Sequence, residues 1–383
     1  MKETSKIGTT LKTALYTVAV SLLIVCSVYN QAVGCNPNKV IAHCYADSMS
    51  VEAMHFIENL PADLQNKQAD AIKAAIAGEH KALMDVRTSR NKKPDLPIEV
   101  DAIDLNVNYR LYTSKAQIDS TRSLLIYLHG GGWCFGSNNS CATFCAELVK
   151  ESGIAVLSVD YPLAPEHPYP SSLNACVEAL SYAYEHASDW GVDPNKISIG
   201  GDSAGGNLAL TTAIKMVYTQ EQVNRTGVKA NLPKIYSLVL FYPVVKVWND
   251  GSESWEHFKN AYGLDGELMA TFNMAYLNGA DPQLPLISPF NASTKHLAQL
   301  PPTLLINADH DILRDQGKEM YNKMKEAGAN IQRIVLPGTT HLFITVPGQP
   351  TAFNHALKST IDFLKKKWHR RLSHCGVYSD IVQ

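Results

Sequence analysis

The chain has 383 residues, of which 45% are hydrophobic and 18% are charged, and its formal net charge is −2 at pH 7. This composition is ordinary for a globular protein with a large core. The near-neutral charge excludes a strongly basic nucleic-acid-binding protein and an acidic disordered chain. The sequence contains no internal repeat or low-complexity tract. A chain of this length suits one large α/β enzyme core with insertions.

Residues 1–34 have the order of a secretory signal peptide. Three lysines precede an apolar run over residues 14–28, and small residues follow up to Cys35. The run is short for a membrane span, which needs roughly 20 residues. We therefore predict a secreted or periplasmic protein, with an uncleaved membrane anchor as the alternative. The segment Ala-Val-Gly-Cys at 32–35 also resembles a bacterial lipobox, so a lipid on Cys35 would attach the protein to a membrane.

The chain has eight cysteines, which fits export. Removal of the signal discards Cys26, and lipidation would use Cys35. The six that remain could pair in disulfides, although Cys141 and Cys145 lie four apart in a helical stretch where a direct bond would be strained. No Cys-x-x-Cys occurs, so we expect no cysteine metal site. The six are Cys44, Cys134, Cys141, Cys145, Cys176 and Cys375.

Residues 51–86 are predicted to be helical, with one break at Pro61. Apolar residues spaced three and four apart could share one face. A polar, proline-containing linker follows at 92–97. A helical pair packed on the core is the preferred interpretation, and a lid over an active site is the alternative. Alternating apolar residues from Ile103 to Leu111 then predict one half-buried strand. The shared helical face would consist of Ile72, Ala75, Ile76 and Leu83.

A continuous apolar run at 124–128 predicts a buried parallel strand, and it ends in His-Gly-Gly-Gly-Trp at 129–133. Consecutive glycines let the backbone turn and leave N–H groups open to a ligand. Ester hydrolysis builds negative charge on a carbonyl oxygen, which fixed backbone donors stabilise. We therefore predict an oxyanion hole here; a flexible turn is the alternative. The predicted donors are Gly131, Gly132 and Ala204, with His129 holding the loop by hydrogen bonds.

The central motif is Gly-Asp-Ser-Ala-Gly at 201–205, with Ser203 in the middle. A strand-like run at 196–199 leads into it and a helix-like run at 207–217 leads out, as in a nucleophile elbow. Such a strained turn projects the serine hydroxyl from the end of a sheet. Gly201 and Gly205 would keep strand and helix from colliding. A glycine-rich turn with an ordinary serine is the alternative.

Three motifs in this order resemble the hormone-sensitive-lipase group of α/β-hydrolase esterases. They are the segments at 129–133 and 201–206 and, between them, Asp-Tyr-Pro-Leu-Ala-Pro-Glu-His-Pro-Tyr-Pro at 160–170. Pro162 stands where the group carries arginine, which puts one ion pair in doubt but not the catalytic plan. The resemblance covers roughly Ile103 to Leu364. Supporting motif residues are Gly130, Gly201, Asp202, Gly205, Glu166 and His129.

The resemblance implies an α/β-hydrolase fold, with a mostly parallel central sheet, helices on both faces and a helical cap. It also implies hydrolysis of a short-chain carboxylic ester without a metal or other cofactor. A further buried strand is predicted at 237–245, followed by an aromatic-rich stretch at 248–280. This insertion would have a small core of its own and would join the N-terminal helices in a cap that shapes the acyl pocket.

The catalytic acid is expected after the strand predicted at 302–308, because acid and histidine follow the serine in this architecture. The group's pattern Ala-x-x-Asp-x-Leu-x-Asp places Asp311 at the acid position, with Leu313 and Asp315 matching behind it. Asp309 is the alternative acid. His310 lies beside the acid but lacks the pattern of a catalytic histidine.

The catalytic histidine is expected after the strand predicted at 330–336. His341 matches the group's Gly-x-x-His-x-Phe, with Leu342 where glycine is common. Serine is a poor nucleophile at neutral pH. His341 would therefore take the proton of Ser203 and later give one to the leaving alcohol. Asp311 would fix the imidazole tautomer and stabilise its charged form.

Three functions fit this set of residues. A serine carboxylesterase is the leading hypothesis, and an amide deacetylase or peptidase with the same triad is the second. The third is a small-ligand receptor on this fold, although such receptors lose the histidine that this chain retains. A small ester is the expected ligand, and no nucleic-acid partner is expected.

The chain is predicted to divide into five segments. They are a signal peptide or anchor at 1–34, a helical cap segment at 35–100, the first part of the core at 101–245, a cap insertion at 246–285, and the second part of the core with a tail at 286–383.

Overall fold

The computed structural model describes residues 48–116, 121–227 and 232–366. From Ser50 onward these residues belong to one compact unit. The predicted signal peptide at 1–34 and the candidate lipidation site Cys35 lie outside the described residues, so both stay predictions. Within residues 48–116, 121–227 and 232–366, no helix is long and apolar enough to cross a membrane.

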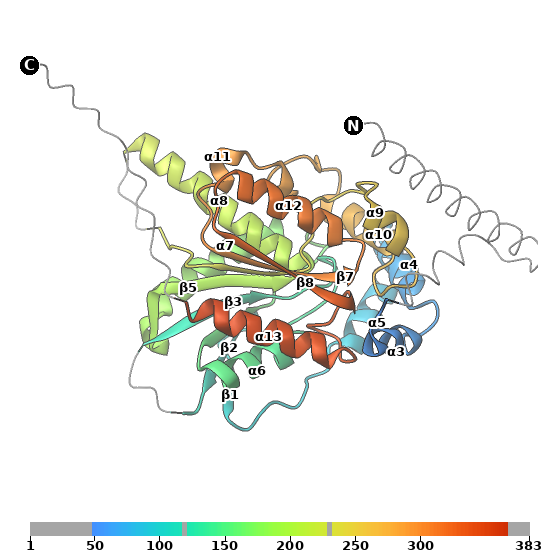
Figure 1. The fold of residues 1–383 in the computed structure, drawn as a ribbon, viewed down its shortest axis with the longest axis horizontal. Helices are drawn as coiled ribbons and strands as arrows, with labels where there is room; N and C mark the ends of the chain where they lie inside the picture. Colours follow the sequence, from blue (N-terminus) through green and yellow to red (C-terminus); the bar gives the residue numbers. More distant parts are fainter. Residues whose placement is uncertain (1–47, 117–120, 228–231, 367–383) are drawn as a thin grey trace, which may run out of the picture. The chain divides into compact units, whose positions relative to one another are not determined.

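A single mixed sheet runs through the unit, with the strand order β1-β2-β4-β3-β5-β6-β7-β8 among the described residues (Figure 1). All neighbouring strands from β4 to β8 pair in parallel, whereas β2 is antiparallel to both β1 and β4. Parallel strands end at the same edge of a sheet, so the segments that follow them meet there. The strands are β1 (Val100–Asp104), β2 (Tyr109–Ser114), β3 (Arg122–Leu128), β4 (Ala155–Val159), β5 (Val192–Asp202), β6 (Leu238–Phe241), β7 (Thr303–His310) and β8 (Ile331–Thr340).

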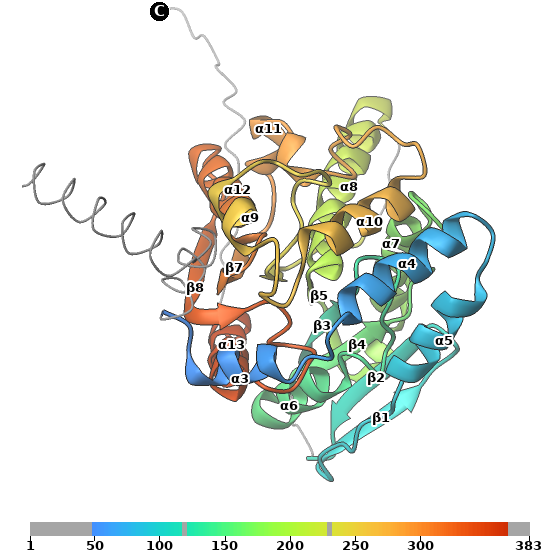
Figure 2. The same cartoon turned by 90° about the vertical axis from the view of Figure 1, so that its right-hand side faces the viewer.

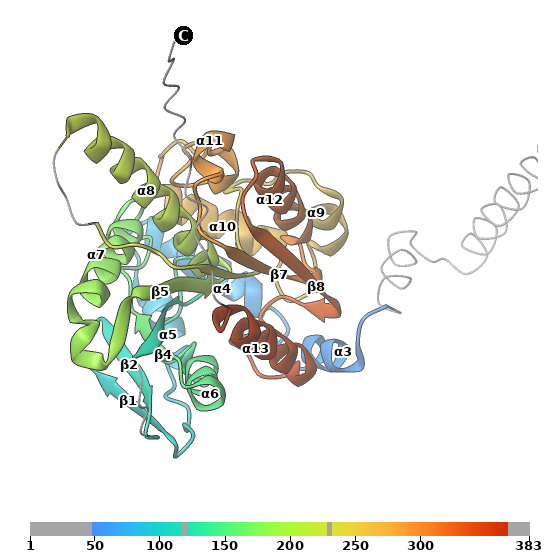
Figure 3. The ribbon, with the colours of Figure 1, turned by 60° about the vertical axis from the view of Figure 1, so that its left-hand side comes forward.

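Helices cover both faces of the sheet, as Figures 1 and 3 show. One face carries α6 (Ala142–Ser152) and α13 (Pro350–Leu364). The other carries α7 (Ser171–His186), α8 (Ala204–Thr226) and α12 (Arg314–Glu326). Coverage on both sides explains why β4 and β6 are buried along their whole length and consist of apolar runs. The predicted mostly parallel sheet with helices on both faces is confirmed. Short connecting helices are η1 (Ser188–Trp190), η2 (Pro289–Asn291) and α11 (Thr294–Leu297).

Two segments far apart in sequence meet beyond the end of the sheet. The first contains α3 (Val51–Glu58), α4 (Leu64–Ile76) and α5 (Lys81–Arg90), and the second contains α9 (Glu253–Phe258) and α10 (Gly266–Leu277). Helices α4 and α10 pack side by side (Figure 2). The backbone N–H of Asp265 donates to Gln65 Oε1 over 2.7 Å, and Lys73 pairs with Glu267. Helix α4 of the N-terminal segment and α10 of the insertion thus pack against each other.

The helical prediction for residues 51–86 is wrong in one detail. The segment breaks twice, because α4 ends at Ile76 and α5 begins only at Lys81. Gly78 has a φ of +98°, a conformation that suits glycine and ends a helix. The four apolar residues do not form one buried face, because Ile76, the last residue of α4, is exposed. Ile76 is 42% exposed, whereas Ile72, Ala75 and Leu83 are buried.

The strand predicted from Ile103 to Leu111 is also wrong. The chain turns between β1 and β2, and Asn106 Oδ1 accepts hydrogen bonds from the backbone N–H groups of Asn108 and Tyr109. Such a side-chain-to-backbone turn competes with an extended strand. Val107 lies at the turn and is 88% exposed. Alternation of apolar residues continued across the hairpin turn by coincidence.

Disulfide pairing is not found among the cysteines that the structure describes. Cys134, Cys141, Cys145 and Cys176 are all buried free thiols. Burial raises the pKa of the Cys134 and Cys176 thiols far above its ordinary value, so both stay protonated. The other cysteines lie outside the described residues. Within those residues, no cluster of three or more His, Cys, Asp or Glu side chains could hold a metal ion.

Candidate active site

Ser203 lies in the sharp turn between β5 and α8, with φ +54° and ψ −116°. Its backbone N–H donates to the carbonyl of Phe241 over 2.9 Å, which ties the turn to β6. A Cβ on Gly201 or on Gly205 would collide with the carbonyl oxygen of Leu128 at the end of β3. The two glycines are therefore required by the close approach of the neighbouring strand.

The structure brings Ser203, His341 and Asp311 into one hydrogen-bonded chain. His341 Nδ1 lies 2.7 Å from Asp311 Oδ2, and His341 Nε2 lies 3.1 Å from Ser203 Oγ. A carboxylate accepts, so Nδ1 carries the proton and Nε2 can accept from the serine hydroxyl. Asp311 Oδ1 accepts from the N–H of Leu313 over 2.9 Å. All three side chains of the triad are buried.

The loop that carries His341 is held by Gln349, which sequence reasoning missed. Gln349 Oε1 accepts from the N–H of Thr340, and its amide nitrogen donates to the carbonyls of Thr340 and His341. Leu342 has a φ of +74°. This left-handed conformation explains why glycine is common at that place in the resembled group. The Tyr242 ring packs against the imidazole with a centroid separation of 4.3 Å.

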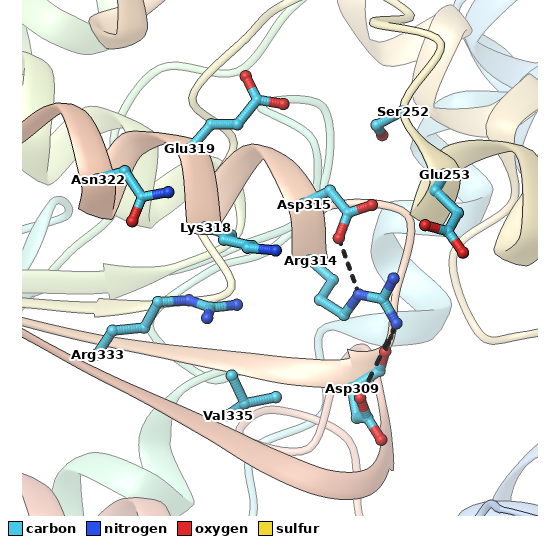
Figure 4. A pocket seen from close by; sticks show the side chains of 10 residues that line it. All are labelled: Ser252, Glu253, Asp309, Arg314, Asp315, Lys318, Glu319, Asn322, Arg333 and Val335. Carbon is cyan, nitrogen blue, oxygen red and sulfur yellow. Dashed lines mark hydrogen bonds and ion pairs between the residues drawn. The ribbon is translucent and has the colours of Figure 1, made fainter. Parts of the chain in front are cut away.

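The alternative acid Asp309 points elsewhere. It lines a charged surface cleft of about 550 Å³ (Figure 4), where it faces Arg314, and its Oδ2 accepts from the N–H of Gly338 over 3.2 Å. The neighbouring His310 packs its ring against Phe258. The cleft is lined by Ser252, Glu253, Asp309, Arg314, Asp315, Lys318, Glu319, Asn322, Arg333 and Val335, so it does not include the triad.

The glycine loop, residues 129–133, follows β3 and lies on the opposite side of Ser203 from His341 and Asp311. Gly131 and Gly132 have φ values of +120° and +60°, and a Cβ would strike the Phe135 backbone at Gly131 and the Phe272 ring at Gly132. The backbone N–H groups of Gly131, Gly132 and Ala204 donate to no other group among the described residues. Three donors are therefore open beside the serine, as an oxyanion hole requires.

His129 and Asp202 hold this loop by hydrogen bonds to Gly130. His129 Nδ1 donates to the carbonyl of Gly130 over 2.9 Å, and burial lowers the pKa of His129 to about 4, so its ring is neutral at pH 7. Asp202 Oδ1 accepts from the N–H of Gly130 and from the Tyr127 hydroxyl, each over 3.0 Å. Burial raises the pKa of Asp202 to about 6, although these hydrogen bonds oppose that rise.

Glu166 has an ion-pair partner despite the proline at 162. The guanidinium of Arg87 in α5 contacts both of its carboxylate oxygens, at 2.8 Å and 2.9 Å. Sequence reasoning did not find Arg87, because it lies 79 residues before Glu166 and belongs to no motif. Glu166 thus takes its ion-pair partner from a different part of the chain.

Residues 125–345, more than half of the chain, match the family model of the alpha/beta hydrolase fold. The chain belongs to the α/β-hydrolase family. It is similar to the ethyl acetate hydrolase of Pseudomonas putida, with 28% identity over 76% of this chain and 85% of that protein. It is also 28% identical to carboxylesterase NlhH of Mycobacterium tuberculosis, over 79% of this chain and 91% of the relative.

Among solved structures, the hyperthermophilic esterase from Pyrobaculum calidifontis superposes on this α/β hydrolase with a TM-score of 0.64. The two are 27% identical, and the match covers 83% of this chain and 98% of that one. The family match and these esterase relatives confirm the prediction of a hormone-sensitive-lipase-like carboxylesterase.

Proposed function

We propose that this α/β hydrolase cleaves short-chain carboxylic esters through Ser203, His341 and Asp311, by way of an acyl-enzyme. The observation that carries the proposal is the unbroken hydrogen-bond chain from Asp311 through His341 to Ser203. The chain ends beside the open N–H donors of the glycine loop. A nucleophile, its base, the group that orients the base and an oxyanion site are thus all present in one place.

The geometry supports the following sequence of steps. Ser203 Oγ attacks the ester carbonyl carbon while its proton passes to His341 Nε2, and Asp311 stabilises the resulting imidazolium. The carbonyl oxygen becomes an oxyanion and accepts from the N–H groups of Gly131, Gly132 and Ala204. Collapse of this intermediate expels the alcohol, which takes the proton from His341. Water then attacks the acyl group on Ser203 by the same route and releases the carboxylic acid.

The preference for short acyl chains is supported by the aromatic surroundings of the glycine loop. The Phe272 ring lies against Gly132, and the Trp133 ring stacks on Tyr276 with a centroid separation of 4.2 Å. Both partner rings come from α10, so bulky side chains of this helix pack directly against the glycine loop. One relative is an ethyl acetate hydrolase, whose substrate has a two-carbon acyl group.

Hydrolysis of p-nitrophenyl esters from C2 to C12 tests this function. We expect turnover that falls as the chain lengthens, and loss of about 10⁶-fold in kcat for Ser203→Ala, since one triad deletion removes most of the triad's effect. Thermal unfolding of the variant controls for an intact fold. Faster cleavage of p-nitroacetanilide than of the acetate ester would favour an amide hydrolase. No turnover by folded wild-type protein would favour the receptor reading.

A further inference from the structure

Arg87 is the most completely hydrogen-bonded arginine near the site. It lies in the last turn of α5, and its side chain is 16% exposed. Besides the two bonds to Glu166, its Nε donates to the carbonyl of Cys134 and its Nη2 donates to the carbonyl of Ala164, both over 2.8 Å. A guanidinium has five N–H donors on three nitrogens in a fixed plane, so it can reach acceptors that the single nitrogen of an ammonium group cannot reach together.

The two carbonyls that Arg87 holds belong to residues that are themselves tied to the glycine loop. The N–H of Cys134 donates to the carbonyl of Gly131 over 3.1 Å, and the N–H of Ala164 donates to the carbonyl of Trp133 over 2.8 Å. One side chain from α5 therefore clamps the loop through both connections. Glycines have little conformational preference of their own, so contacts from outside must set the direction of their N–H groups.

Glu166 supplies the charge that keeps Arg87 in place. Burial of Glu166 acts to raise its pKa, but the hydrogen bonds from Arg87 and the charge of Arg87 leave the pKa lowered. The carboxylate is thus ionised at neutral pH, and the pair is bidentate, which fixes the plane of the guanidinium.

We propose that Arg87 is a positioning residue for the oxyanion hole: it aligns the N–H groups of Gly131 and Gly132 without touching the substrate. The inference rests on the proposed function, because those donors act on an ester oxyanion. It gives the N-terminal helices a role beyond covering the site, since α5 determines how well the transition state is stabilised.

The test compares Arg87→Met and Arg87→Lys with wild type. We measure kcat and KM for p-nitrophenyl acetate and Ki for a trifluoromethyl ketone. The serine hydroxyl adds to the carbonyl of this inhibitor, and the adduct carries an oxyanion. Misplacement by about 1 Å can cost about 10²-fold, so Arg87→Met should lower kcat about 10- to 100-fold and weaken the ketone by the same factor. KM should stay within about twofold. Arg87→Lys should recover only part, because lysine cannot bridge both carbonyls and the carboxylate.

Lys81→Met is the matched control, because it removes the same charge from the same helix. Among the described residues Lys81 pairs only with the exposed Asp85 in α5, and the kcat of Lys81→Met should equal that of wild type. Glu166→Gln, which keeps the shape of the side chain, should change kcat and Ki in the same direction as Arg87→Met. It provides the test if Arg87→Met does not fold.

If Arg87 has only a structural role, Arg87→Met and Glu166→Gln should lower the melting temperature but leave kcat and Ki within about twofold of wild type. That result would overturn the inference about Arg87 and leave the proposed function standing. If folded wild-type protein hydrolyses no ester, the proposed function fails and the inference fails with it.

Discussion

Ser203 lies between two groups of residues that act through different kinds of atoms. On one side, Asp311 and His341 supply side-chain atoms that are joined by two hydrogen bonds. On the other side, the glycine loop supplies only backbone N–H groups, and its shape depends on positive φ values at Gly131 and Gly132. The first side depends on which functional groups are present, whereas the second depends on where a side chain is absent.

The supports differ in the same way. On the acid–base side, Asp311 follows β7 directly and His341 follows β8 directly, and Gln349 holds the loop that carries His341. The glycine loop is contacted by side chains from two helices outside the sheet, Arg87 in α5 and Phe272 in α10, and by Asp202 at the end of β5. Chemical substitution should therefore damage the first side most, and steric or distant changes should damage the second.

The largest effect is expected on the acid–base side. Asp311→Asn keeps the shape of the residue but no longer fixes the tautomer of His341, and it should lower kcat about 10⁴-fold. Asp309→Asn is the matched control: it makes the same change two residues away, on a carboxylate that faces Arg314. It should lower kcat less than tenfold. Steady-state hydrolysis of p-nitrophenyl acetate measures both, and the reverse order of effects would move the acid to Asp309.

A smaller effect is expected from adding one methyl group on the glycine side. Gly132→Ala places a Cβ at a φ of +60°, where it collides with the Phe272 ring. Displacement of one oxyanion donor should cost about 10²- to 10³-fold in kcat. The double variant Gly132→Ala, Phe272→Ala removes the collision and should recover at least about tenfold. A kcat for Gly132→Ala within tenfold of wild type would show that this N–H does not need its observed position.

The difference between the triad and the glycine loop also explains which residues could be predicted from the sequence. Ser203, Asp311 and His341 each follow a strand and lie in short motifs of the resembled group, so the resemblance could place them along the chain. The strands that carry them are β5, β7 and β8, and the parallel order of these strands brings their ends to one edge. The resemblance could place these residues because each functional group is a side chain in a short motif at a strand end.

The groups that hold the loops could not be found in this way. Arg87 reaches Glu166 across 79 positions, and Gln349 binds the histidine loop without belonging to a motif. Such contacts depend on how helices pack, which local periodicity does not specify. The two errors in the fold concern single exposed residues: Ile76 ends α4 without a buried contact surface, and Val107 lies at a turn that Asn106 stabilises.

Asp202, beneath the glycine loop, gives the smallest and most pH-dependent expected effect. Burial raises its pKa from 3.8 to about 6, so the ionised form destabilises the fold. Below about pH 4 the carboxyl is protonated in both folded and unfolded chains and there is no penalty. Between pH 4 and 6 the unfolded chain loses the proton first, and stability falls as pH rises. Above pH 6 the full penalty applies, about 3 kcal/mol.

Asp202→Asn removes that charge and keeps Oδ1 as an acceptor for Gly130 and Tyr127. The variant should be more stable than wild type at pH 8 by up to about 3 kcal/mol, reduced by the cost of an amide group where Oδ2 has no partner among the described residues. The gain should disappear toward pH 4, which urea unfolding at both pH values measures. Since Gly130 keeps its acceptor, kcat should fall less than tenfold. A gain that is equal at both pH values would mean that ionisation of Asp202 is not its cause.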